Sequence, residues 1–324
     1  MGDLLSTCGA INWDINLFVK RFPEPGEEVR VLKITRVPGG TAANVAVAAA
    51  RLLGPGKVAF LGALGDDDIG RTQIEILRSE GILADAIRIV KGEESGQAYI
   101  VIEESGQNVI HTYFGANLKV DPDYITSEQA RRVVERSRVV VIMDPPLEAA
   151  ETLASLAREA GATVIWDPGV YVEEGLDRLR GAMEDVDYFI LNEIETRNLL
   201  GSAEPGRVAE IMREVSPGSR FIIKLGAKGS RIVDSDTGES VFVSGVPLEK
   251  LGMGVVNTVG CGDAFIGAFA SCKYLGFDDV DALVRANVAG AFKATRPETR
   301  GSPTRQQLEE MYERSREHIV IERE

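Results

Sequence analysis

The sequence predicts an α/β protein in which residues 1–324 form one domain, with a mostly parallel sheet covered by helices on both faces. From about residue 120 onward, short apolar strands alternate with helical stretches, which is typical of a buried parallel sheet. With 44% apolar residues, the chain can bury a large core. Residues 12–38 and 95–116 contain strand-like segments that this core does not need, so we expect them to form a small separate sheet, a lid.

The first 120 residues begin with a strand and a helix of small residues. Residues 4–11 are predicted as a strand that ends in the polar Asn12-Trp13-Asp14, and Gly39-Gly40-Thr41-Ala42-Ala43-Asn44 precedes an alanine-rich helix. The run Asp66-Asp67-Asp68 is compatible with a metal site, but such runs more often cap a helix. The other elements expected here are strands at 29–37, 57–64, 96–104 and 108–114, a turn at Ser105-Gly106, and helices at 45–53 and about 70–79.

The remainder of the chain supplies most of the parallel sheet and its covering helices. Each strand there is a short apolar run, and each helix shows apolar residues at helical spacing. The expected strands are 138–143, 162–166, 188–191 and 221–225 with a β-ribbon at 230–243, and the expected helices are 127–137, 147–160, 193–200, 207–215, 264–275, 279–295 and 304–318.

Composition and charge exclude several classes of function. The net charge of −14 argues against nucleic acid or an anionic membrane as a partner, because both are bound through cationic surfaces. Cys8, Cys261 and Cys272 are too few and too scattered for a disulfide framework or a zinc site, which fits a reducing cytoplasm. The N-terminus lacks a cationic start followed by a long apolar region, and no stretch approaches a membrane span. We therefore expect a cytoplasmic protein.

The most informative stretch is Asn257-Thr258-Val259-Gly260-Cys261-Gly262-Asp263-Ala264, a glycine-flanked turn that leads into a small-residue helix. The stretch from Gly260 to Asp263 should leave several unpaired N–H groups at the helix start, suited to a phosphate or a developing phosphoryl anion. A carboxylate at Asp263 would repel a phosphate that was merely held there, so it suggests a second role, such as accepting a proton from a hydroxyl. The alternative is that Asp263 only caps the helix.

Four polar segments are expected at the carboxyl ends of strands, where α/β sheets bind ligands. They are Asn12–Asp14, Gly39–Asn44, Asn192–Glu195 and Gly260–Asp263. Asn192 and Glu195 are three residues apart, so their oxygens are candidate ligands for hydrated Mg²⁺, with a helix cap as the alternative.

Taken together and in this order, three of these motifs resemble the ribokinase (PfkB) family of small-molecule kinases. They are Gly39-Gly40-Thr41-Ala42-Ala43-Asn44, Asn192-Glu193-Ile194-Glu195 and Thr258-Val259-Gly260-Cys261-Gly262-Asp263, and the resemblance spans about residues 5–303. It implies the ribokinase-like three-layer α/β/α fold, ATP as phosphoryl donor, Mg²⁺ as cofactor, and a lid that closes over the acceptor. It further implies a homodimer that forms through the lid.

The resemblance also assigns roles to residues. Asp263 matches the general base, and Gly260, Cys261 and Gly262 match the backbone anion hole. Substrate-binding positions are matched by Asn12, Asp14, Gly39, Gly40 and Asn44, and nucleotide-binding positions by Asn192, Lys224, Gly226, Gly229 and Asn287, with Glu195 and Asn192 in the magnesium region.

Three departures from the family pattern bear on the chemistry. Cys261 stands where alanine is commoner, but only its N–H group is needed. Asn257 replaces a frequent aspartate near the family's monovalent-cation site, and the loop 295–302 is longer than usual there, so activation by potassium is not expected. Thr41 replaces the lysine of ribokinases proper, which leaves the acceptor open.

Several functions remain to be distinguished. The leading one is phosphorylation of a primary hydroxyl of a sugar by ATP. A nucleoside kinase of the adenosine or cytidine type would use His111 and Tyr113 of the lid to hold a base, although such residues more often only pack the lid. A sugar-phosphate kinase would use the lid cations Arg21, Arg30, Lys33 and Arg36. A catalytically silent binding protein is disfavoured by the intact Asp263, and a nicotinamide-dependent oxidoreductase by the lack of a Gly-x-Gly-x-x-Gly motif after the first strand.

Overall fold

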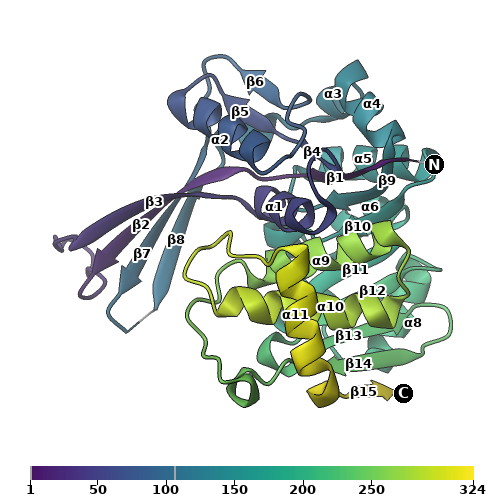
Figure 1. Ribbon diagram of the computed structural model, residues 1–324. Coiled ribbons are helices and arrows are strands. Elements are labelled where there is room, and N and C mark those ends of the chain that lie inside the picture. Colours follow the sequence, from purple (N-terminus) through teal and green to yellow (C-terminus); the bar gives the residue numbers. More distant parts are fainter. Residues whose placement is uncertain (1, 106) are drawn as a thin grey trace.

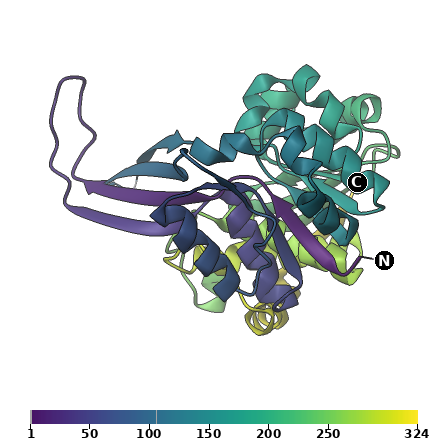
Figure 2. The same ribbon diagram turned by 90° about the horizontal axis from the view of Figure 1, so that it is seen from above.

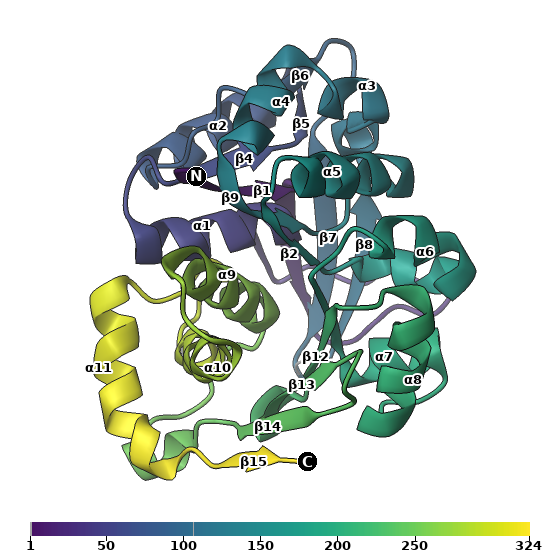
Figure 3. The same cartoon turned by 90° about the vertical axis from the view of Figure 1, so that its right-hand side faces the viewer.

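The computed structural model describes residues 2–105 and 107–324 and has three layers, with a central sheet between two layers of helices (Figures 1 and 3). Alternate residues of the central strands enter opposite layers. In β9 (Ser137–Ile142), for example, Val139 and Val141 pack into the core on one face while Val140 and Ile142 pack into the core on the other. The strands are apolar on both sides for this reason, as the sequence predicts. The predicted fold class is confirmed.

The central sheet has nine strands in the order β15-β14-β13-β12-β11-β10-β9-β1-β4. The six strands from β12 to β4 are parallel, and β13, β14 and β15 form an antiparallel edge. The strands other than β9 are β1 (Leu4–Cys8), β4 (Val58–Leu61), β10 (Thr163–Trp166), β11 (Tyr188–Asn192), β12 (Arg220–Lys224), β13 (Gly229–Asp234), β14 (Ser240–Ser244) and β15 (Ile321–Arg323).

Two groups of helices cover the sheet, one on each face (Figure 3). One face carries α1 (Thr41–Leu53), α9 (Cys261–Leu275), α10 (Asp279–Ala294) and α11 (Arg305–Ser315), and the other carries α4 (Glu128–Glu135), α5 (Leu147–Glu159), α6 (Leu176–Met183), α7 (Glu193–Leu200) and α8 (Pro205–Val215). Small side chains let α1, α9 and α10 pack closely. Gly267 of α9 lies directly against Ala48 of α1, and an added Cβ would overlap it. No helix in the described part of the chain is both long and apolar enough to cross a bilayer.

A second sheet of four strands projects from the body of the molecule (Figures 1 and 2). Its order is β3-β2-β7-β8, formed by β2 (Asn12–Val19), β3 (Lys33–Gly39), β7 (Gly96–Glu103) and β8 (Asn108–Tyr113). The sequence predicts this small sheet from residues 12–38 and 95–116. The residues of β8 are all exposed, so one edge of the sheet is open to solvent.

The structure corrects several expected boundaries. Asn12–Asp14 is not a loop after the first strand, because β1 ends at Cys8 and Asn12 begins β2 of the small sheet. The strand expected at 57–64 is divided at Gly62 into β4 and β5 (Ala63–Gly65). Asp67 caps α2 (Asp68–Ser79) by accepting from the Gly70 N–H, which favours the capping interpretation of the aspartate run. Of the turn expected at Ser105-Gly106, Gly106 lies outside the described residues. Elements without a prediction of their own are β2, α3 (Pro122–Ile125), α6, β6 (Arg88–Val90) and β15.

Candidate active site

The site lies where the carboxyl ends of the central parallel strands meet the start of α9. Gly260 precedes α9 with φ 85°, a left-handed conformation that favours glycine. An added Cβ would overlap the carbonyl oxygen of Thr299, so the turn is pressed against the loop that follows α10. This turn places the start of a 15-residue helix at the site. The Cys261 N–H group donates to the Thr258 carbonyl at 3.2 Å, so the expectation that it is unpaired is wrong, because the turn before the helix closes with this hydrogen bond.

Asp263 lies in the first turn of α9 and is oriented by a chain of hydrogen bonds. Its Oδ2 accepts from the Asn44 amide at 2.8 Å, and Asn44 Oδ1 accepts from Arg300 Nε at 2.9 Å. Arg300 also donates to the Gly39 carbonyl at 2.8 Å. Because Arg300 holds the Asn44 carbonyl, the NH₂ group of Asn44 must face Asp263. One carboxylate oxygen of Asp263 is thereby fixed and the other has no hydrogen-bond partner in the described part of the chain.

Gly39 and Gly40, two of the predicted site residues, lack side chains and so let neighbouring groups approach the backbone closely. Asp14 of β2 packs on Gly39, where a Cβ would overlap its carboxylate. Gly40 has φ 91° and lies against the backbone of Ile11 and Asn12, so a larger residue would push α1 away from β2. Asn12 itself accepts from the Asn117 amide at 2.8 Å, at the base of the lid.

A third carboxylate joins Asp14 and Asp263. Asp144 follows β9, and its Oδ1 accepts from the Ala10 N–H at 3.0 Å and from the Thr41 hydroxyl at 2.8 Å. Burial raises the pKa of Asp14 to about 7, against the opposing charge of Arg300 and with that of Asp263. Burial likewise raises the pKa of Asp263 to about 6, while the Asn44 hydrogen bond and the Lys224 ammonium limit the rise. Three carboxyl groups at one place form a set of acceptors for hydroxyl groups.

A partly buried cation lies on the other side of Asp263. Lys224 Nζ, at the end of β12, donates to Asp167 Oδ2 at 2.6 Å. Burial is the largest influence and opposes its charge, but the carboxylates of Asp167, Glu195 and Asp263 together outweigh burial and raise the pKa of Lys224. The same ammonium lies 3.7 Å from where a Cβ on Gly262 would be, which places it beside the N–H groups at the start of α9. Lys224 and the helix start thus present positive charge to one point.

Asn192 and Glu195 hydrogen bond to each other's backbone in a capping box at the start of α7. Glu195 N donates to Asn192 Oδ1 and Asn192 N donates to Glu195 Oε2, both at 2.8 Å. Burial raises the pKa of Glu195, and the nearby Asp167 charge adds to it. No group of three or more His, Cys, Asp or Glu side chains forms a metal cluster within the described residues. The capping box shows that the helix-cap alternative holds for Asn192 and Glu195, and it uses one oxygen of each side chain.

A cavity of about 330 Å³ adjoins Lys224 and the start of α9. Four of the five predicted nucleotide-binding residues line it, namely Lys224, Gly226, Gly229 and Asn287, and so do Cys261 and Gly262. Asn192 is not among its lining residues. Asn287 donates to the Val243 carbonyl at 3.1 Å, so its amide also ties α10 to β14. The walls are otherwise mostly apolar or backbone, as for a planar base.

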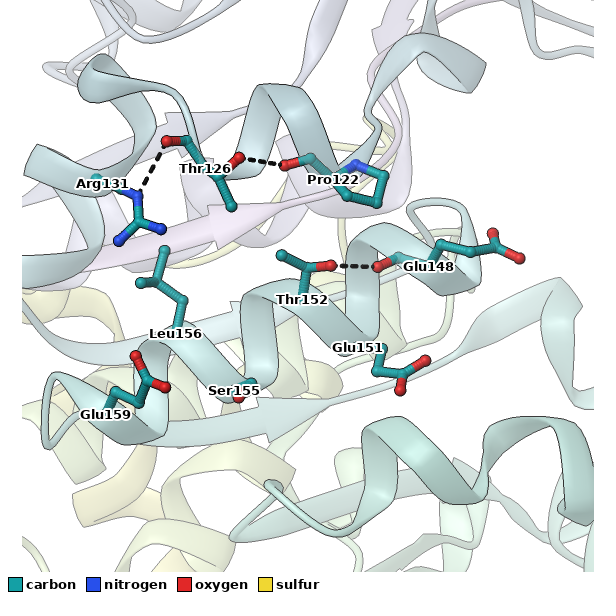
Figure 4. A pocket seen from close by; sticks show the side chains of 9 residues that line it. All are labelled: Pro122, Thr126, Arg131, Glu148, Glu151, Thr152, Ser155, Leu156 and Glu159. Atoms are coloured by element: carbon teal, nitrogen blue, oxygen red, sulfur yellow. Dashed lines mark hydrogen bonds between the residues drawn. The ribbon is translucent and has the colours of Figure 1, made fainter.

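A larger groove of about 450 Å³ lies away from this site, between α5 and the segment of α3 and α4 (Figure 4). Three of its polar side chains donate to carbonyl groups of nearby helix backbone. The hydroxyls of Thr126 and Thr152 donate to the Pro122 and Glu148 carbonyls, and Arg131 donates to the Thr126 carbonyl. The side chains of Glu148, Glu151 and Glu159 do not converge on one point (Figure 4). We assign no chemistry to this groove.

Sequence reasoning missed four residues of the site, namely Asp144, Asp167, Lys293 and Arg300. Asp144 and Asp167 each follow a predicted strand, so the rule that identified Asn192 also applies to them. Arg300 and Lys293 lie beyond any strand end, and only the packing of the loop after α10 brings them to the site.

The site combines a helix start, a carboxylate beside it, a cluster of carboxyl groups that can accept from hydroxyls, and an adjoining cavity. This combination is typical of a small-molecule kinase. The pfkB family carbohydrate kinase profile matches residues 3–305. The chain therefore belongs to the pfkB family of carbohydrate kinases, and it is an ATP-dependent sugar kinase.

Named relatives agree with this assignment. The chain is 31% identical to the ribokinase of Schizosaccharomyces pombe over 81% of this chain and 83% of that protein. It is 30% identical to the ATP-dependent ribose-1-phosphate kinase of Halopiger xanaduensis over 92% of this chain and 94% of that protein. The structure of Arabidopsis thaliana ribokinase complexed with ribose and ATP superposes with a TM-score of 0.84 at 28% identity, covering 96% of this chain and 99% of that chain.

Proposed function

We propose that Asp263 is the general base that accepts the proton of a primary sugar hydroxyl as this hydroxyl attacks the γ-phosphoryl group of ATP. The observation that supports this most is the position of Asp263, which has one oxygen fixed by Asn44 and lies between the acidic cluster and Lys224. A carboxylate that is partly desolvated and has a raised pKa is a stronger base than one in water.

The charge that develops on the transferred group would be stabilised by the N–H groups of Gly260 and Gly262 and by Lys224, and by the Cys261 N–H group if it left the Thr258 carbonyl. Phosphoryl transfer depends mainly on positioning and charge stabilisation, so these groups are sufficient partners for Asp263. When bound, Mg²⁺ would supply further positive charge to the phosphates, held through water by Glu195 and Asp167. The small sheet would close over the acceptor and exclude water from the phosphoryl group.

The acidic cluster favours a neutral acceptor with several hydroxyl groups over one that carries a phosphate. Asp14, Asp144 and Asp263 would accept hydrogen bonds from hydroxyls, whereas a phosphate in their place would be repelled. The lid cations are weak evidence for a phosphorylated acceptor. Arg21 is already paired with Glu27 at 2.5 Å, and both Lys33 and Arg36 are exposed to solvent. Ribose is the first acceptor to test, because named relatives are ribokinases.

The experiment is an ADP-release assay over ribose, ribose-1-phosphate, fructose, adenosine and cytidine. We expect a free sugar to give the highest kcat/KM. Preference for ribose-1-phosphate would place a phosphate site at the lid, and preference for adenosine or cytidine would assign base binding to His111 and Tyr113. If none of these acceptors raised ADP release above background, the result would contradict the proposed reaction.

The raised pKa values predict a pH dependence. A protonated Asp263 cannot accept a proton, so we expect kcat/KM to fall as the pH drops through about 6. The Asn44 hydrogen bond lowers the pKa of Asp263, so Asn44→Ala should move this fall to higher pH. The measurement is the pH profile of kcat/KM for both proteins at saturating ATP. An unchanged profile in Asn44→Ala would show that a different group controls it.

We further propose that the lid sheet mediates a homodimer. Its outer strand β8 is fully exposed and carries Val109, Ile110 and Tyr113 at 42%, 56% and 45% exposure. Such an apolar edge is open to pairing with a second copy. We expect sedimentation equilibrium to give twice the chain mass and Ile110→Lys to give the single chain mass. A monomeric wild-type protein would rule out this dimer.

We also propose that the protein works in the cytoplasm. Cys8, Cys261 and Cys272 are all unpaired, which fits a reducing compartment. Fractionation of the source cells should recover the protein with cytoplasmic enzymes, and recovery from an oxidising compartment would contradict this.

A further inference from the structure

Lys293 is a fully buried lysine that lacks an acidic partner. It lies in the last turn of α10, its exposed fraction is 0%, and none of the salt bridges in the described part of the chain involves it. Burial lowers its pKa. An ammonium group that is removed from water without a carboxylate is costly, so its contacts need a functional or structural reason.

The ammonium group of Lys293 is held by backbone carbonyls from two segments. Nζ donates to the Asn257 carbonyl at 2.9 Å and to the Arg296 carbonyl at 3.4 Å. Asn257 belongs to the turn before α9, and Arg296 to the loop after α10. Gly301 of the same loop packs on the lysine stem, where an added Cβ would lie 3.1 Å from Cδ of Lys293.

The same two segments are joined by other contacts. Asn257 Nδ2 donates to the Pro297 carbonyl at 2.8 Å, and Asn257 Oδ1 accepts from the Val259 N–H at 2.9 Å. Gly260 in turn lies against the Thr299 carbonyl. The loop after α10 therefore sets the position of the turn that presents the N–H groups at the start of α9.

We propose that Lys293 is a positioning residue whose ammonium group serves as a built-in cation, holding the Asn257 and Arg296 carbonyls and thereby fixing the Gly260–Gly262 anion hole. A monovalent cation does not fit here, because Lys293 Nζ already occupies the place between these carbonyls. The enzyme therefore works without potassium. This inference rests on the proposed role of the anion hole in phosphoryl transfer.

The test compares variants in buffers that contain either KCl, NH₄Cl or choline chloride at equal ionic strength, with ATP as a Tris salt. Lys293→Ala removes the charge and leaves room for a small cation. Lys293→Met removes the charge and fills the room. Lys273→Ala is the control, because Lys273 on α9 also donates to a backbone carbonyl, that of Phe277 at 3.0 Å, far from the anion hole.

In choline chloride we expect both Lys293 variants to lose kcat by tenfold or more, roughly the effect of removing a hydrogen bond to a charged group. K⁺ or NH₄⁺ should restore Lys293→Ala in a saturable manner and should not restore Lys293→Met. The wild type and Lys273→Ala should have the same kcat in all three salts. A purely structural role for Lys293 would not produce rescue by small cations.

Three results would overturn the proposal. These are stimulation of the wild type by K⁺, full activity of Lys293→Ala in choline chloride, or a folded Lys293→Ala protein that no small cation activates. Should Lys293→Ala not fold, the potassium response of the wild type decides the matter. Should the wild type phosphorylate no acceptor, the proposed function fails separately, and the thermal unfolding midpoint of Lys293→Ala in KCl against choline chloride still tests the cation site. A higher midpoint in KCl supports the proposal, and equal midpoints overturn it.

Discussion

Asp263→Asn is expected to lower kcat on the order of 10²- to 10⁴-fold, the contribution that general base catalysis usually makes. Asparagine keeps the size of the side chain and removes its ability to accept the proton. The nucleotide cavity does not include Asp263, so the affinity for ATP should remain nearly unchanged. Steady-state kinetics with the preferred sugar, together with ATP binding by calorimetry, measure both quantities.

The matched control is Asp281→Asn. Asp281 is the third residue of α10, as Asp263 is the third residue of α9, and both aspartates lie at the positive end of a helix. If Asp263 only stabilised the helix start, both changes would cost at most about 1 kcal/mol of stability and leave kcat unchanged. A large loss of kcat in Asp263→Asn alone supports the base. Equal kcat in Asp263→Asn and the wild type would remove Asp263 from the mechanism.

An element can be predicted from the sequence when its local residue pattern agrees with its surroundings in the folded chain. The helix predicted at 193–200 is found as α7 (Glu193–Leu200), because its capping residues stand next to a buried strand. The turn before α9 was likewise identified, since glycines at a helix start have a specific backbone role. Asn12 was harder to place. The sequence suggests that it ends the first strand, whereas it begins β2 and contacts Asn117, a residue 105 positions away in the chain.

Residues that act through long-range contacts could not be predicted. Arg300 reaches Asn44 across 256 positions of the chain, and nothing near Arg300 in the sequence indicates this partner. Lys293 lies in a helix of small residues, where a single lysine is usually expected on the solvent side. The structure instead buries it, because carbonyl groups of two loops converge on its ammonium group. This arrangement of carbonyl groups arises from the packing of the loops, so no local sequence pattern indicates it.

Lys224→Met is expected to give the second large loss, on the order of 10²- to 10³-fold in kcat, as for removal of one donor that stabilises transition-state charge. Methionine keeps the length of the side chain and removes the cation beside Gly262. It also leaves the carboxylate of Asp167, which is only 5% exposed, without its partner. We therefore expect a lower thermal unfolding midpoint as well, because a buried unpaired charge is destabilising.

The double variant Lys224→Met with Asp167→Asn separates these two effects. Asparagine removes the unpaired charge, so the unfolding midpoint should recover, whereas kcat should stay low because the cation is still missing. Lys228→Met is the control, since Lys228 lies four residues further on, just after β12, and is exposed. Recovery of kcat together with the midpoint would show that Lys224 serves stability alone. With kcat low and the midpoint restored, the loss of kcat in Lys224→Met does not come from lost stability, as expected if the ammonium group of Lys224 stabilises the phosphoryl group as it moves from ATP to the sugar.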